Sequence, residues 1–111
     1  MPHAAPGTPR AYPEPPRASP ADEAFWRFHE RNPRVYALLV AFARRAKAAG
    51  AARVGVRMLW ERMRWEVQVE TADPAGDEWK LNDHYTSRYA RLLMAREPDL
   101  RGLFETRELR D

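Results

Sequence analysis

The expected fold depends on residues 56–81, which read VRMLWERMRWEVQVETADPAGDEWKL. The first part of this stretch has apolar residues at the spacing of one helix face: Val56, Leu59, Trp60 and Met63. From Trp65 to Thr71 apolar and polar residues alternate instead, which is typical of a half-buried strand. Residues 73–76 have the composition of a turn, and residues 79–81 can form a second strand. The stretch therefore predicts a short helix followed by a β-hairpin.

Three more helices are expected around this hairpin. The first begins after Ser19, because serine caps helix N-termini and Pro20 suits the first turn, and it ends before Pro33. The second runs from Pro33 to about Ala49, and the last covers about residues 84–96. The expected core contains the apolar residues of these helix faces, two tryptophans of the hairpin and a short C-terminal return: Phe25, Phe28, Val35, Leu38, Leu39, Phe42, Ala46, Trp60, Trp65, Trp79, Tyr85, Tyr89, Leu92, Leu93, Leu100, Leu103 and Phe104.

These elements predict an α+β fold with about four helices and one β-hairpin. We expect residues 20–111 to form a single domain, since that length supports one modest core. The order helix, helix, hairpin is winged-helix-like by analogy only, because another helix follows the hairpin and the wing would be acidic.

The N-terminus differs from the rest of the chain in composition. Residues 1–20 hold seven of the ten prolines and few apolar side chains. Such a segment is typical of a disordered or polyproline-like tail. We expect residues 1–19 to be disordered and residues 1–18 to be removable without unfolding the domain. The string of residues 13–16, PEPP, is a weak candidate ligand for an aromatic groove.

Several classes of protein are excluded by the sequence. The chain has no cysteine, so it has no disulfide, zinc–thiolate site or thiol nucleophile. No apolar run approaches the roughly 20 residues of a membrane span, and the N-terminus lacks the pattern of a signal peptide. Neither serine lies in a GxSxG motif, no HExxH motif occurs, and the glycines are dispersed. We therefore expect a cytoplasmic protein that is not an enzyme and has no metal or cofactor.

Charge is the strongest functional signal. The net charge is +3 and the calculated pI is about 9.7, but the charges are not evenly spread. Residues 27–64 contain ten Lys or Arg against two Glu, whereas residues 65–86 contain one Lys against six Asp or Glu. This pattern predicts separate basic and acidic surfaces, and a basic surface attracts nucleic acid.

The segment NDHYTSRYAR, residues 82–91, adds polar groups to this signal. It places Asn, His, Thr, Ser and two Arg in the first turns of a helix, where recognition helices present base and phosphate contacts. The alternative is an ordinary amphipathic helix with a solvated polar face. The candidate nucleic-acid-binding residues come from this helix and the preceding one: Arg57, Arg62, Arg64, His84, Ser87, Arg88 and Arg91.

Residues 25–109 resemble a family of small phage and prophage proteins of unassigned activity. The resemblance is carried by FWRFHERNPRVY (25–36), LWERMRWEV (59–67), KLNDHYTSRYARLLM (80–94) and FETREL (104–109). It implies a phage-related role in the host cytosol and brings no catalytic residue with it.

Two functions follow from these features. The first is nucleic-acid binding, with DNA favoured, through the arginines of residues 53–64 and 88–91. The second is a protein–protein interaction module that inhibits or adapts a host or defence factor through its charged surfaces, the acidic hairpin acting as contact or nucleic-acid mimic. Arginines gathered on one face of the fold would favour the first, and dispersed arginines would not. The sequence does not specify the oligomeric state.

Overall fold

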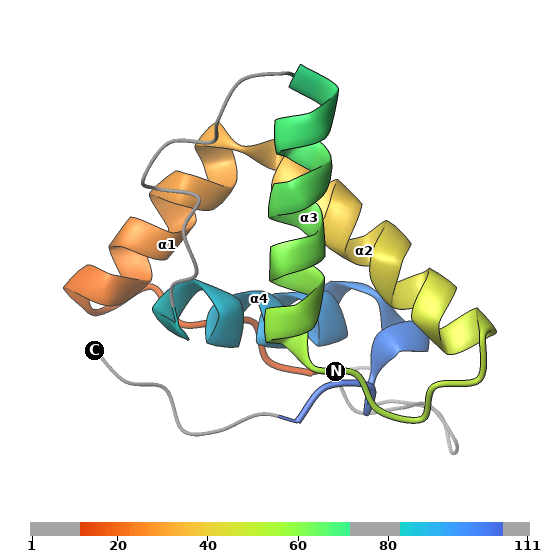
Figure 1. The fold of residues 1–111 in the computed structure, drawn as a ribbon. Coiled ribbons are helices and arrows are strands. Elements are labelled where there is room, and N and C mark those ends of the chain that lie inside the picture. The colour runs from red at the N-terminus through yellow and green to blue at the C-terminus, as the bar shows by residue number, and fades with distance from the viewer. Residues whose placement is uncertain (1–11, 72–82, 106–111) are drawn as a thin grey trace, which may run out of the picture.

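The part of the chain that the structure describes folds into four α-helices and one 3₁₀ turn. A computed structural model describes residues 12–71 and 83–105 (Figure 1). Its elements are α1 (Pro20–Arg31), α2 (Pro33–Ala48), α3 (Val56–Thr71), α4 (Asp83–Arg96) and the 3₁₀ turn η2 (Pro98–Leu100). In Figure 1, α1 and α2 meet at a corner, α3 packs against α2, and α4 contacts all three other helices.

The predicted ends of the first two helices are confirmed. Ser19 caps α1: its hydroxyl accepts a hydrogen bond from the Asp22 N–H at 3.1 Å, and the Asp22 carboxylate accepts one from the Ser19 N–H at 2.9 Å. This reciprocal pair satisfies N–H groups that have no partner within the helix. Asn32 separates α1 from α2, and Gly50 follows α2 with a φ of +101°, a conformation that favours glycine.

The predicted hairpin is wrong, and with it the α+β class. Residues Trp65–Thr71, expected as a strand, form the second half of α3, and the described residues contain no strand. The predicted turn and the second strand, residues 73–76 and 79–81, lie outside the described residues. The described fold is therefore all-helical, and the winged-helix analogy has no basis in it.

Helix continuity explains why α3 extends through the alternating residues. Neither Gly nor Pro occurs between Gly55 and Pro74, so no residue stops the helix once it has formed. Adding a residue to an existing helix is easier than starting a new element. Val67 follows Met63 by four positions and is buried with it, so it also satisfies helix spacing. An ion pair of 2.9 Å between Arg62 and Glu66, one turn apart, further supports the helix.

The core is close to the one predicted. Trp60, Tyr89, Leu92 and Leu93 have no exposed surface, and Leu100, Leu103 and Phe104 are buried as the expected C-terminal return. The main-chain N–H of Val54 donates to the carbonyl of Leu103 at 2.9 Å, which ties the loop before α3 to that return. Trp65 was expected in the core but is 54% exposed. In a helix it lies about 200° around the axis from Met63, away from the buried face.

The second half of the proline-rich segment contacts the helices. Pro15 is buried, and the indole N–H of Trp26 donates to the carbonyl of Pro16 at 3.0 Å. Glu14 forms an ion pair of 2.7 Å with Arg96 on α4, and the Arg17 guanidinium lies 3.7 Å from the Trp26 ring centre. Residues 12–18 are therefore held on α1 and α4 by contacts that their composition does not predict. Residues 1–11 lie outside the described residues.

We expect removal of residues 1–16 to lower the melting temperature while the helices remain. The deletion removes the Pro16 carbonyl that accepts from the Trp26 indole and breaks the ion pair of Glu14 with Arg96. A loss of about 1 kcal/mol corresponds to roughly 4–8 °C for a domain of 60–100 residues. Thermal unfolding followed by circular dichroism measures it, with a deletion of residues 1–11 as the control that retains these contacts. An unchanged melting temperature after the longer deletion would show that the contacts add no stability.

Candidate functional site

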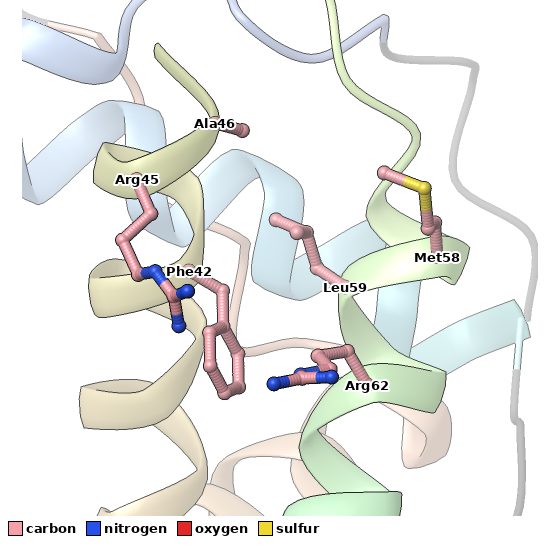
Figure 2. Close-up of a pocket in the computed structure, with 6 residues that line it drawn as sticks. All are labelled: Phe42, Arg45, Ala46, Met58, Leu59 and Arg62. Atoms are coloured by element: carbon pink, nitrogen blue, oxygen red, sulfur yellow. The ribbon is translucent and has the colours of Figure 1, made fainter. Parts of the chain in front are cut away.

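The three predicted site residues of α3 do not form one surface. Arg57 and Arg64 are seven positions apart and lie on the same side of the helix, whereas Arg62 points toward α2 (Figure 2). Arg64 is half-buried and pairs with Glu61 at 3.3 Å, and Arg62 pairs with Glu66 at 2.9 Å. Two of the three guanidinium groups are thus partly neutralised within their own helix.

The predicted site residues of α4 lie closer to the core than expected. His84, Ser87 and Arg91 are half-buried, and Arg88 has no exposed surface. The Arg88 guanidinium donates from Nε and Nη2 to Oδ1 of Asp22, at 3.0 and 2.9 Å, and from Nη1 to the His84 carbonyl at 3.1 Å. No phosphate can reach Arg88 in this conformation. The expected position of Arg88 on an exposed face of α4 is therefore wrong, and its contact with nucleic acid stays a prediction.

Helix spacing explains where Arg88 lies. It follows the half-buried Tyr85 by three positions and precedes the buried Leu92 by four, so it belongs to the inner face of α4. A buried guanidinium requires a charged partner, and Asp22 supplies it from the start of α1. The sequence contained one part of this signal, since Arg88 interrupts an apolar face. It did not show the partner, which is 66 residues away.

Asp22 is an ionised structural group. Burial opposes its charge, but hydrogen bonds from the Ser19 and Ala18 N–H groups and from Arg88 outweigh burial and lower the pKa of Asp22 to about 2. Both carboxylate oxygens have donors, so this buried pair joins α1 to α4 and leaves no group free for proton transfer.

A shallow groove lies between α2 and α3. It encloses about 420 Å³ and is lined from α2 by Phe42, Arg45 and Ala46 and from α3 by Met58, Leu59 and Arg62. Figure 2 shows the Arg62 guanidinium directed toward the Phe42 ring. Its central carbon lies 5.6 Å from the centre of that ring and 5.5 Å from that of Trp65. Apolar and cationic groups are therefore in contact within one groove.

Large apolar side chains are exposed beside this groove. Met58 is 62% exposed and Trp65 is 54% exposed, which sets them apart from the other large apolar residues of the described chain. Met58, Arg62 and Trp65 are spaced at i, i+4 and i+7 and share one face of α3. We call this face together with the groove lining the α2–α3 surface. Met, aromatic residues and Arg are the types enriched at the cores of protein interfaces.

The electrostatics of the α2–α3 surface are cationic. Helix α2 carries four basic residues and no acidic one. Arg44 pairs with Glu97 at 2.7 Å and Asp99 at 3.0 Å, and Lys47 donates to the Asp99 carbonyl. Within the described residues, no carboxylate lies at ion-pair distance from Arg45. Arg45 is exposed at the edge of the groove, available to an acidic group of a partner.

Sequence reasoning missed most of this surface. The sequence pattern predicts Phe42 and Trp65 in the core and does not indicate Arg45 or Met58 as site residues. The available signal was the helix spacing of Met58, Arg62 and Trp65, which the strand interpretation of residues 65–71 concealed.

No protein-family model, curated protein or solved structure matches this chain. The resemblance to small phage proteins therefore stays a prediction. None of the helices in residues 12–71 and 83–105 is long and apolar enough to cross a membrane. The same residues contain no group of three or more His, Asp or Glu side chains arranged to hold a metal ion.

Proposed function

We propose that this chain is a non-enzymatic protein-interaction module that binds its partner through the α2–α3 surface. The observation that supports this most is the exposure of Met58 and Trp65 on the same face as Arg62, beside an apolar groove. Large apolar side chains left in water are costly for a monomer and become favourable when a partner covers them.

Burial of these two side chains would supply part of the free energy of binding. Covering a large apolar side chain contributes about 1.5–3 kcal/mol when the whole side chain leaves water. Met58 and Trp65 are each more than half exposed, so each would contribute about 1–2 kcal/mol on that scale. Trp and Arg are also the residue types that most often dominate binding energy at protein interfaces.

Nucleic-acid binding, the function first predicted from the charge pattern, stays a prediction with less support. This function would be favoured if the arginines of α3 and α4 lay together on one face. Arg88 is instead buried against Asp22, and Arg62 and Arg64 pair with glutamates of their own helix. With Arg88 inaccessible and the arginines of α3 pointing to different sides, few of them can contact one phosphate backbone together, which weakens the electrostatic term that dominates such binding.

The proposal is tested by placing a photo-crosslinking amino acid at Met58 in the full chain and irradiating living cells. We expect one discrete protein to be crosslinked, and we expect that product to decrease strongly when Trp65→Ala is added, because Trp65 lies on the same face. The matched control carries the crosslinker at Arg27, which is exposed on α1.

Two outcomes would contradict the proposal. One is equal crosslinking from Met58 and Arg27, which would indicate random encounters. The other is binding of DNA or RNA that falls steeply with salt and weakens in Arg57→Ala and Arg62→Ala. On B-DNA each phosphate contact contributes about −0.9 to the log–log salt slope, so titrations at two salt concentrations reveal this mode.

A further inference from the structure

We infer that the partner presents an acidic amphipathic helix to the α2–α3 surface. This inference rests on the proposed function and adds the chemistry of the partner. It is supported by the charge of the surface, by the spacing of its apolar groups and by a groove lining made of side chains without free main-chain groups.

The charge of the groove selects the sign of the partner. Arg45 and Arg62 line it from opposite helices, and none of the described residues that line it is acidic (Figure 2). Glu66, the ion-pair partner of Arg62, lies one turn further along α3. The Arg62 side chain is still 48% exposed, so its guanidinium can donate to a second carboxylate. The Arg45 and Arg62 guanidinium carbons lie 6.0 and 5.6 Å from the centre of the Phe42 ring, so a ligand with acidic groups beside its apolar residues can meet both of them there.

The spacing of the apolar groups selects a helical ligand. Met58 and Trp65 are seven residues apart on α3, which corresponds to about 10 Å along the helix axis. A ligand helix presents side chains at the same spacing from positions i and i+7, with i+3 or i+4 between them facing Phe42 and Leu59.

The lining also disfavours an extended ligand. The groove is formed by side chains of two helices, whose main-chain groups are hydrogen-bonded within the helices. An extended peptide would place its own N–H and C=O groups against the apolar side chains of Phe42, Met58 and Leu59. Those main-chain groups would then have no hydrogen-bond partner. A helix satisfies its main-chain groups internally and therefore avoids this cost. The shallowness of the groove likewise suits an elongated segment better than a small molecule.

A second copy of this chain is a weaker candidate. The chain has a net charge of +3, so its overall charge gives a second copy no net attraction to a basic groove. Sedimentation of the full chain provides the test. We expect a monomer, whereas self-association that is abolished by Met58→Glu would show that the occupant is a second copy and would overturn the inference.

Three synthetic 16-residue peptides test the partner chemistry directly. The first has a helical leucine and phenylalanine stripe flanked by glutamates, the second has lysines in place of the glutamates, and the third is a scrambled form of the first. We expect the full-length protein to bind the first peptide at least tenfold more tightly than the others, as measured by fluorescence anisotropy. Equal binding of the first and scrambled peptides, or no binding of the first, would overturn the inference.

Charge reversal supplies the matched variants. Arg45→Glu together with Arg62→Glu should reverse the preference, so that the lysine peptide binds more tightly than the glutamate peptide. Arg27→Glu, an equivalent change on α1, should leave the preference unchanged. Circular dichroism confirms that each variant is folded. An unchanged preference in the double variant would show that the two arginines do not select the ligand.

The results separate this inference from the proposed function. If crosslinking from Met58 captures one protein but the glutamate peptide does not bind, only the partner chemistry is wrong. If crosslinking yields no discrete protein, the proposed function itself is wrong. A preference for single-stranded DNA over the glutamate peptide would reject both.

Discussion

Replacing Arg88 by alanine should lower the free energy of unfolding by about 3–5 kcal/mol, the usual cost of breaking a buried ion pair from one side. The substitution leaves the Asp22 carboxylate buried without its guanidinium partner, although the Ser19 and Ala18 N–H groups still donate to it. Among the described residues, this is the only ion pair between α1 and α4 whose two side chains are both buried, and the substitution removes it.

Urea denaturation of the full chain measures this loss. The control is Arg27→Ala, which removes an exposed arginine from α1 and should change stability by no more than about 0.5 kcal/mol. A loss below about 1 kcal/mol for Arg88→Ala would indicate that the pair is solvated in solution and that Arg88 is not a core residue.

The dependence of stability on pH provides a second measure of the same pair. The folded protein holds the pKa of Asp22 at about 2, below its usual value near 3.8. A group with a lowered folded pKa stabilises the protein above its unfolded pKa, and this contribution is lost as the pH falls toward the folded value. Wild-type stability should therefore decrease between about pH 5 and pH 2. The decrease should be smaller in Asp22→Asn, which cannot ionise at this position.

Local rules predicted the ends of the helices because those signals are contained in a few neighbouring residues. The cap at Ser19, the break at Pro33 and the glycine at position 50 each act over about one helical turn. The core positions also followed, because they depend only on helix spacing.

The error at residues 65–71 has a different origin. Val67 is four positions after Met63 and two after Trp65, so it satisfies both helix and strand spacing. The alternation of glutamates favoured a strand, but helix continuity from Val56 decided the outcome. Short apolar runs that follow a helix directly are ambiguous for this reason.

The sites could not be predicted because they join distant parts of the chain. Arg88 is a surface recognition residue by local pattern and a core residue once Asp22 faces it, 66 positions earlier. Likewise, Phe42 and Arg62 form a groove only because α2 packs against α3. Nothing in the local sequence of either helix specifies that contact.

Leu92→Ala should reduce the free energy of unfolding by about 2–5 kcal/mol, because it removes buried methyl groups and leaves a cavity. Leu92 has no exposed surface, and α4 contacts each of the other three helices. The cavity would thus open at the centre of the fold, where the helices cannot close around it without losing other contacts.

The expected loss is a large part of the total, since domains of this size are stable by about 5–15 kcal/mol. Urea denaturation at neutral pH measures it. Leu38→Ala is the matched control, because Leu38 is only partly buried and the same truncation there should cost less. Leu92→Met retains most of the volume and should cost less than about 1.5 kcal/mol. If Leu92→Ala and Leu38→Ala proved equally mild, Leu92 would not lie in the core, and the buried face assigned to α4 would be wrong.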